Sequence, residues 1–207
     1  MIDLLKTIVA FGLGYILGSL NSTMIVARFY GVDIRTQGSK SAGLTNALRV
    51  LGKIPALFVL VGDVAKGILA CLVGLYIGVF TQSGDATVCV SLLAAGAGAV
   101  IGHNWPIFFK FKGGKGALTA AAVMLMISWQ AATISLVLFV VIVALTRYVS
   151  LGTVCSTIFF AFLSFLPYWD NTIYFSVTAM FLALIIVVKH RENIHRLMSG
   201  NENKINF

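Results

Sequence analysis

Six apolar runs alternate with polar stretches along the chain. The runs span residues 4–27, 54–80, 86–109, 117–146, 151–168 and 172–188. A helix needs roughly 20 mostly apolar residues to cross the hydrocarbon core of a bilayer. The pattern therefore predicts an all-α polytopic membrane protein, with residues 1–207 forming a single integral-membrane domain. We interpret the first run as a retained helix, because it is too long for a signal peptide.

The run 117–146 decides the number of crossings. As one helix it would be about 45 Å long, whereas the hydrocarbon core is about 30 Å thick. The polar residues at 128–130 favour two short helices, which gives about seven transmembrane helices. Five helices are the alternative, and they would place Arg147 and Ser150 outside.

Basic residues divide the polar stretches into two groups. Lys and Arg occur in the stretches 28–53, 110–116, 147–150 and 189–207, whereas the other loops hold Asp85 and Asp170. Cytoplasmic loops of membrane proteins carry the excess of Lys and Arg. We therefore expect these four stretches and the C-terminus in the cytoplasm, and the N-terminus outside.

The composition supports the membrane class. Of the 207 residues, 59% are hydrophobic and 11% are charged, which is too little charge to cover a water-facing surface. This excludes a soluble enzyme, a disordered chain and a secreted disulfide scaffold. The net charge of +8 comes from the loops, so it indicates topology, an anionic substrate or anionic lipid rather than nucleic acid. The three cysteines form no metal or disulfide pattern.

The stretch 38–49 combines hydroxyl groups, an amide, glycines and cations. Glycine lets backbone N–H groups approach an anion closely, and a helix N-terminus attracts negative charge. We expect a helix to begin near Leu44. The chemistry suits a phosphate, and the alternative is an ordinary hydrophilic loop. The candidate residues are Gly38, Ser39, Lys40, Ser41, Gly43, Thr45, Asn46 and Arg49.

A second glycine-rich stretch opens a helix that carries Thr119 on its first turn. It lacks the spacing of a Walker A loop, but lysines among glycines at a helix start are again suited to an anion. The alternative is a basic loop that anchors two helices. Two such stretches on one face favour phosphate binding. The candidates here are Lys112, Gly113, Gly114, Lys115 and Gly116.

Two shorter polar segments add candidates near the end of the chain. One is the segment 147–151, which includes Ser150, and its side of the membrane depends on the seven-helix topology. The other is the segment 190–193, in which helical spacing puts His190 and Asn193 on one side.

Two ionisable residues lie inside the run 54–80. Asp63 and Lys66 are three residues apart, and intramembrane charges are costly unless they are paired or functional. We expect them to pair with each other. His103 is either a proton-transfer residue or an interfacial structural histidine beside Trp105.

At these polar segments the chain resembles the bacterial membrane-embedded acyl-phosphate:glycerol-3-phosphate acyltransferases. The family pattern Gly-Ser-Gly-Asn-x-Gly-Ala-Thr-Asn-x-x-Arg is met from Gly38 to Arg49, with Lys40, Ser41 and Leu44 as departures. The family's Lys-Gly-Gly-Lys-Gly is met without change at 112–116. The segments 147–151 and 190–193 resemble its third and fourth motifs. The resemblance covers nearly the whole chain.

The resemblance implies a multi-pass protein of the bacterial cytoplasmic membrane with a site that faces the cytoplasm. The implied reaction transfers a fatty acyl group from acyl phosphate to the 1-hydroxyl of glycerol 3-phosphate, giving lysophosphatidic acid for phospholipid biosynthesis. By similarity, Ser39, Thr45 and Asn46 would hold acyl phosphate. The residues that would hold glycerol 3-phosphate and the departing phosphate are Arg49, Lys115, Ser150, His190 and Asn193. No metal or other cofactor is expected.

Three alternatives remain at this stage. The departures at Lys40 and Ser41 could mark an acyltransferase for a different phosphorylated acceptor. A transporter for an organic phosphate would explain the basic loops, but the chain shows neither an internal repeat nor polar positions through several helices. A non-catalytic scaffold leaves the clustered motifs unexplained. The oligomeric state and the acyl-chain preference do not follow from the sequence.

Overall fold

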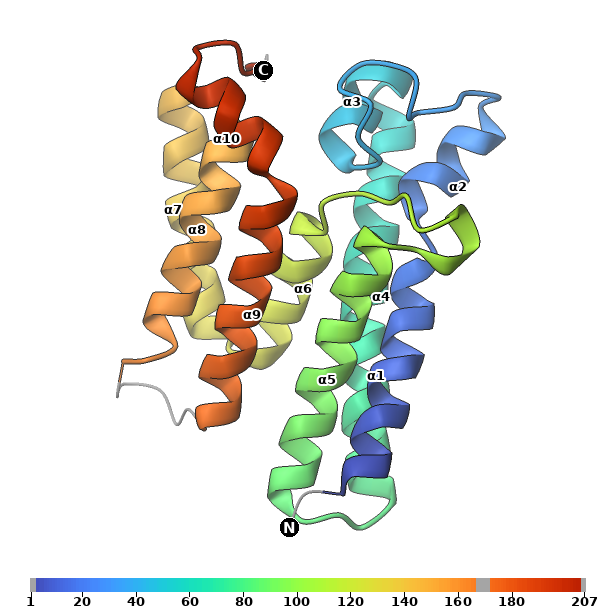
Figure 1. Ribbon diagram of the computed structural model, residues 1–207, viewed down its shortest axis with the longest axis vertical. Helices are drawn as coiled ribbons and strands as arrows, with labels where there is room; N and C mark the ends of the chain where they lie inside the picture. The colour runs from blue at the N-terminus through green and yellow to red at the C-terminus, as the bar shows by residue number, and fades with distance from the viewer. Residues whose placement is uncertain (1–2, 167–171, 206–207) are drawn as a thin grey trace. The chain divides into compact units, whose positions relative to one another are not determined.

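The computed structural model describes residues 3–166 and 172–205, and every regular element in these ranges is a helix (Figure 1). The predicted all-α class is therefore confirmed. The elements are α1 (Leu4–Ser19), α2 (Ser22–Phe29), α3 (Leu44–Leu51), α4 (Lys53–Phe80), α5 (Asp85–Asn104), the 3-10 helix η1 (Ile107–Phe109), α6 (Ala117–Ile127), α7 (Trp129–Thr146), α8 (Val149–Leu163), α9 (Ile173–Lys189) and α10 (Arg191–Met198).

The chain divides into two compact units, Met1–Val123 and Met124–Phe207. In the first unit α1, α4 and α5 run side by side, and α3 packs against α4 (Figure 1). In the second unit α8 packs against both α7 and α9. The ring of Phe160 in α8 meets the ring of Phe175 in α9 edge-on, with 5.7 Å between their centroids.

Small residues bring α1 and α5 into backbone contact. A Cβ on Gly14 would overlap the backbone of Ala95, and a Cβ on Gly18 would overlap that of Ala99. Between membrane helices the lipid gives no hydrophobic driving force, so close packing of small residues is a principal source of association. The spacing of four residues on each helix keeps the contact on one face.

The first apolar run is broken, which the pattern of apolar residues did not predict. The helix α1 ends at Ser19, and α2 begins at Ser22 after a cap by Asn21. The Asn21 side chain accepts a hydrogen bond of 3.0 Å from the backbone N–H of Met24. An asparagine in this role satisfies a donor at the start of a helix and thereby favours a new helix over continuation of the old one.

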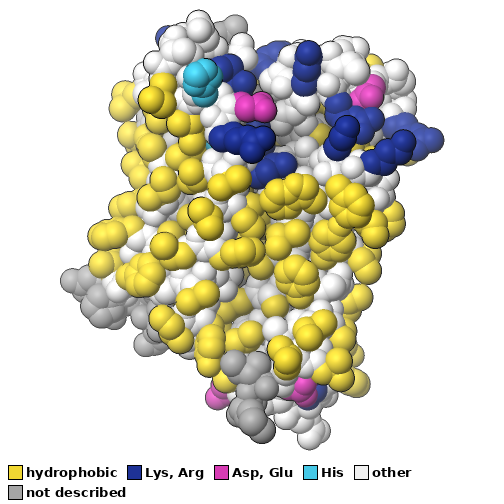
Figure 2. All heavy atoms as spheres, viewed as in Figure 1, with side chains coloured by type: hydrophobic (Ala, Val, Ile, Leu, Met, Phe, Trp, Pro, Cys, Tyr) yellow, Lys and Arg dark blue, Asp and Glu magenta, His cyan; other side chains and the backbone are white. Residues whose placement is uncertain are grey.

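The lengths and surfaces of the helices agree with a membrane protein. Large apolar side chains are exposed along α1, α4 and α7, and Figure 2 shows hydrophobic side chains along the flank of the first unit, with Lys and Arg gathered at one end. Among the described residues, four segments are long and apolar enough to span: Leu4–Phe29, Lys53–Phe80, Asp85–Phe109 and Trp129–Thr146. The pair α9 and α10, bent by 59°, is a fifth candidate.

The expected division of the run 117–146 is confirmed. The helix α6 ends at Ile127, and Ser128 leaves the helical conformation with φ −151° and ψ 94° before α7 starts. At 1.5 Å per residue α6 is only about 16 Å long. A count of seven crossings requires α6 and α8 to cross as well, so that count stays a prediction.

Replacing a contact glycine in α1 should destabilise the protein. We expect Gly14→Val to lower the free energy of unfolding by about 1–3 kcal/mol or more, because its side chain would force α1 away from α5. Thermal unfolding in detergent measures the effect. Gly12→Val is the matched control, since a Cβ at Gly12 meets no atom within 4 Å. Equal melting temperatures for the two variants would contradict the assigned contact.

Candidate functional site

Asn46 organises the first candidate loop. Its side-chain oxygen accepts a 2.8 Å hydrogen bond from the backbone N–H of Ser39. Its amide nitrogen donates to the carbonyl oxygens of Ile34 (3.2 Å) and Gln37 (3.1 Å). The residue is only 2% exposed. The helix α3 begins at Leu44, as expected, and holds Asn46 under the loop, so this side chain shapes the loop rather than facing out of it.

Two of the loop residues adopt left-handed backbone. Gly38 has φ +57°, and a Cβ there would overlap the side-chain oxygen of Asn46. Lys40 also has φ +57°, at a position where the family pattern has glycine. A non-glycine residue in this conformation costs roughly 1–2 kcal/mol, so the lysine is held there by the surrounding loop. Of the other departures, Leu44 packs against the core cluster of Ala47, Ala56 and Val59, and nothing in the structure explains Ser41.

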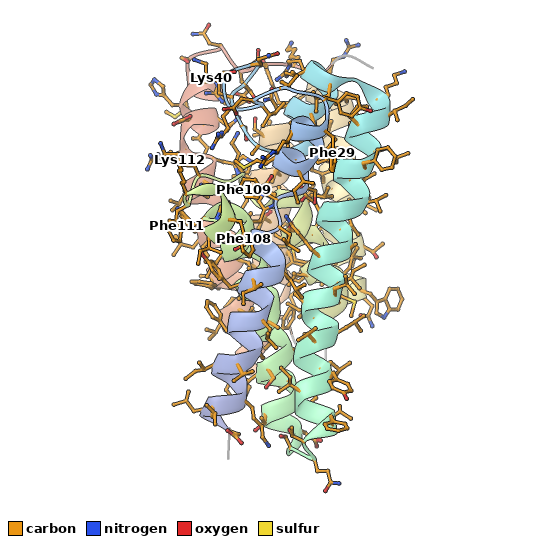
Figure 3. All side chains as sticks on the ribbon, turned by 90° about the vertical axis from the view of Figure 1, so that its right-hand side faces the viewer. Phe29, Lys40, Phe108, Phe109, Phe111 and Lys112 are labelled. Atoms are coloured by element: carbon orange, nitrogen blue, oxygen red, sulfur yellow. The ribbon has the colours of Figure 1, made fainter. Side chains whose placement is uncertain are left out.

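The second candidate loop packs directly on the first. A Cβ on Gly114 would overlap both the carbonyl oxygen of Ala42 and the ring of His103. The backbone N–H of Gly114 donates to the carbonyl oxygen of His103 (3.2 Å). Figure 3 shows Lys40 and Lys112 on the same side of the first unit. The two glycine-rich stretches thus touch at Ala42 and Gly114, and a joint phosphate site there stays a prediction.

A buried ionic cluster lies behind this loop contact. Lys66 Nζ is 2.8 Å from Asp63 Oδ1 and 2.8 Å from His103 Nδ1, and it donates to the carbonyl oxygen of Leu20 (3.3 Å). Thr119 Oγ1 lies 3.5 Å from the same ring nitrogen. The expected Asp63–Lys66 pair is therefore confirmed. Sequence reasoning missed His103 as its third member, because nothing local connects positions 37 residues apart.

In the second unit a carboxylate gathers residues of the last two motifs. Glu202 Oε1 accepts hydrogen bonds from Ser150 Oγ (2.9 Å) and Asn193 Nδ2 (2.7 Å). Its Oε2 accepts from Arg196 Nε (2.8 Å). Sequence reasoning did not select Glu202, which lies in the polar tail with no motif around it. Ser150 and Asn193, which the resemblance assigns to one substrate, share this acceptor atom.

His190 occupies the bend between α9 and α10. It is 4% exposed, and its Nδ1 lies 2.8 Å from the carbonyl oxygen of Ile186. The basic tail contains the helix α10, which begins at Arg191. His190 and Asn193 are both buried.

The charge of Glu202 is stabilised in the folded protein. Burial raises the pKa of its carboxyl group, but hydrogen bonds from Asn193, Arg196 and Ser150 outweigh burial and hold the pKa below its usual range. The unfolded chain therefore binds the proton more readily than the folded chain does. The stabilisation is present at neutral pH and is lost only as the pH falls through the acidic range.

The candidate residues thus form two groups. The first unit holds the glycine-rich loops, with Arg49 exposed in the last turn of α3 and Lys115 half-buried between Gly114 and Gly116. The second unit holds Ser150, His190 and Asn193. A helical membrane protein with paired glycine and lysine loops is suited to substrates that carry both a phosphate and an apolar chain.

The comparisons with known proteins identify the family. The family model for glycerol-3-phosphate acyltransferase matches residues 8–200. The chain is 38% identical to the glycerol-3-phosphate acyltransferase of Thermoanaerobacter sp. (strain X514), over 93% of this chain and 92% of the relative. It is 40% identical to that of Clostridioides difficile (strain 630), over 92% and 91%. The chain belongs to the glycerol-3-phosphate acyltransferase family.

Solved structures agree with this assignment. The crystal structure of PlsY (YgiH), an integral membrane glycerol 3-phosphate acyltransferase, in its glycerol 3-phosphate form has a TM-score of 0.86 and 32% identity, and the match covers 97% of this chain and 96% of that one. The lysophosphatidic acid form gives a TM-score of 0.83 at 32% identity, with coverage of 97% and 95%. The resemblance stated from the motifs is confirmed, and the protein is an integral membrane acyltransferase.

Removing the Asn46 side chain should loosen the first loop. Asn46→Ala deletes three hydrogen bonds, each worth about 1 kcal/mol net, so the amide of Ser39 should exchange with solvent at least tenfold faster. Hydrogen exchange followed by mass spectrometry over residues 34–43 measures this. Lys53→Ala, at an exposed position at the start of α4, should leave the exchange unchanged. Unchanged exchange in Asn46→Ala would return Asn46 to the candidates for substrate binding.

Proposed function

We propose that this protein transfers a fatty acyl group from acyl phosphate to the 1-hydroxyl of glycerol 3-phosphate. The products are lysophosphatidic acid, which feeds phospholipid biosynthesis, and inorganic phosphate. The observation that carries the proposal is the contact between Gly114 and Ala42, because it joins the two glycine-rich stretches into one surface. Both substrates carry a phosphate, so a site for this reaction needs two anion-binding segments.

The donor needs little activation by the protein. Acyl phosphate is a mixed anhydride and is therefore already activated. The 1-hydroxyl oxygen of glycerol 3-phosphate attacks the acyl carbon. The bond from that carbon to the phosphate oxygen breaks, and inorganic phosphate leaves. The enzyme contributes positioning and stabilisation of negative charge. We assign no residue as a general base, because the phosphate of glycerol 3-phosphate can accept the proton of its own 1-hydroxyl.

We assign the first loop to acyl phosphate. Because Asn46 is engaged with the loop backbone, its role is to shape the loop, and the hydroxyl groups of Ser39 and Thr45 are the groups for the donor phosphate. Phe108 and Phe111 are more than half exposed on the side of the unit that carries Lys112 (Figure 3). Apolar rings beside a lysine suit a molecule with an acyl chain and an anionic head.

We assign the remaining cations and polar groups to glycerol 3-phosphate and the departing phosphate. Lys115 supplies a charge among glycines, and Arg49 supplies a guanidinium that binds phosphate in a two-pronged geometry. Ser150, His190 and Asn193 complete the set by similarity to the family motifs. The proposed site faces the cytoplasm of a bacterial cell, in a protein with seven crossings and an outside N-terminus.

Purified protein in detergent, given acyl phosphate and labelled glycerol 3-phosphate, should form lysophosphatidic acid in the presence of EDTA and without CoA. Lys115→Ala should reduce turnover about a hundredfold or more, because a lost charged contact to the transition state costs a few kcal/mol. Activity seen only with acyl-CoA would reject the proposed donor. A product formed only with another phosphorylated acceptor would reject the proposed substrate.

A matched variant separates substrate binding from net charge. Lys110→Ala removes an exposed lysine five residues earlier and should keep near-normal turnover. Equal turnover in both lysine variants would mean that Lys115 only marks a cytoplasmic loop and has no role in the reaction. Melting temperatures within a few degrees of the unchanged protein would show that both variants remain folded.

Cysteine labelling in sealed cells tests the seven-crossing topology. Ser150 is buried, so the exposed Arg147 next to α8 is the sharper probe. In a background without Cys71, Cys89 and Cys155, we expect Arg147→Cys to react with an impermeant thiol reagent only after the cells are opened. Labelling from outside would support five crossings and remove Ser150 from a cytoplasmic site.

The opposite loop provides the control for that experiment. Ala86 is exposed at the start of α5, at the end of the first unit that the proposed topology places outside together with the N-terminus. Ala86→Cys in the same background should react in intact cells. Failure of both probes to react from outside would contradict the proposed assignment of sides.

A further inference from the structure

The carboxylate of Glu202 holds two residues that the proposed function assigns to the substrate. Ser150 and Asn193 donate to the same oxygen at 2.9 and 2.7 Å, and Arg196 binds the other oxygen at 2.8 Å. The Glu202 side chain is only 7% exposed. Three donors on one buried carboxylate form a strong contact, since hydrogen bonds to a charged acceptor are about twice as strong as neutral ones.

The tail around Glu202 is fixed on both sides of that residue. Before it, the backbone N–H of Asn201 donates to the carbonyl oxygen of Arg196 (2.8 Å). After it, the N–H of Ile205 donates to the carbonyl oxygen of Arg147 (2.9 Å), and Lys204 Nζ lies 5.4 Å from the ring centroid of Tyr148. The tail therefore returns from α10 to the start of α8 and carries the carboxylate to a defined place.

We propose that Glu202 is a positioning residue that fixes Ser150 and Asn193 for binding of glycerol 3-phosphate. The inference rests on the proposed function, which assigns both residues to that substrate. A serine hydroxyl rotates freely and has one proton to give. Here the proton points to Glu202, so Ser150 presents only its lone pairs to the substrate.

This orientation selects the part of the substrate that Ser150 contacts. Lone pairs accept a hydrogen bond from a hydroxyl of the glycerol moiety, whereas a phosphate oxygen without a proton has none to offer. A phosphate next to Ser150 would also face the negative charge of Glu202. Ser150 therefore recognises a glycerol hydroxyl rather than the phosphate.

Glu202 acts through these neighbours and does not itself remove the proton of the substrate. The hydrogen bonds that Glu202 accepts stabilise its charged form and make it a weak base. A general base at neutral pH needs the opposite, a pKa near the operating pH. The contribution of Glu202 is therefore orientation of Ser150 and Asn193.

Kinetics of the full chain with Glu202→Gln test the proposal. Gln keeps the shape but loses the charge and turns a donor toward one of the three partners. We expect the KM for glycerol 3-phosphate to rise roughly tenfold, because charge-assisted hydrogen bonds that orient Ser150 and Asn193 are lost, while the KM for acyl phosphate changes less than about twofold. Asn203→Ala, at an exposed position in the same tail, is the control and should leave both constants unchanged.

A double-mutant cycle distinguishes positioning from a general structural effect. If Glu202 acts partly through Ser150, then Glu202→Gln should raise the KM for glycerol 3-phosphate less in a Ser150→Ala background than in the unchanged protein, because only the positioning of Asn193 is then left to lose. Glu202→Asp retains the charge and should recover part of the loss. Full additivity of the two changes, or equal increases in both KM values, would overturn the proposal. Unchanged constants in Glu202→Gln would do the same.

Stability and activity readouts keep the outcomes separate. Melting temperatures of Glu202→Gln and Glu202→Asp are measured beside the kinetics, and loss of the fold in both would make Glu202 a structural residue and reject the positioning role. Absence of acyl transfer to glycerol 3-phosphate in the unchanged protein would reject the proposed function itself. If the unchanged protein is active and Glu202→Gln has the same KM values, only the inference about Glu202 is rejected.

Discussion

The backbone contact between α1 and α5 is the constraint on which the first unit depends. Gly14 and Gly18 of α1 meet the backbone of α5, and Gly98 and Gly102 of α5 meet the backbone of α1 in return. In a bilayer such contacts replace the hydrophobic effect as the source of helix association. Because α5 is held tightly, the residue at its end, His103, has a fixed place, and the second glycine-rich loop hydrogen-bonds to the carbonyl oxygen of that residue.

The buried charges depend on the same arrangement. Unpaired charges inside a membrane protein are expensive, yet Asp63, Lys66 and His103 lie within hydrogen-bond or ion-pair distance of one another. Lys66 also donates to the carbonyl oxygen of Leu20, where the end of α1 leaves backbone groups without helical partners. The cluster thereby ties α1, α4 and α5 together directly behind the contact of the two loops. A polar network in this position gives the loops a rigid support.

In the proposed function, the two units prepare polar groups for phosphate chemistry by different means. In the first unit a buried amide, Asn46, and glycines at close contacts shape the loops, so their backbone and lysines can approach an anion. In the second unit a carboxylate, Glu202, orients a hydroxyl and an amide. Positioning of this kind suits a donor that is already an activated anhydride, because orientation and charge stabilisation supply most of what the reaction needs.

The sequence by itself determined the features that depend on local pattern. Apolar runs defined the helical membrane class, the polar residues around Ser128 located the break between α6 and α7, and the spacing of glycines and lysines pointed to the family. The break at Asn21 was local too, but the capping asparagine was hidden in an apolar run. Only the tertiary structure decided that Asn46 serves the loop, that His103 joins the Asp63–Lys66 pair, and that Glu202 meets Ser150. The last two contacts join residues that are 37 and 52 positions apart in the sequence. Residues so far apart meet only through the packing of helices, which no local pattern records.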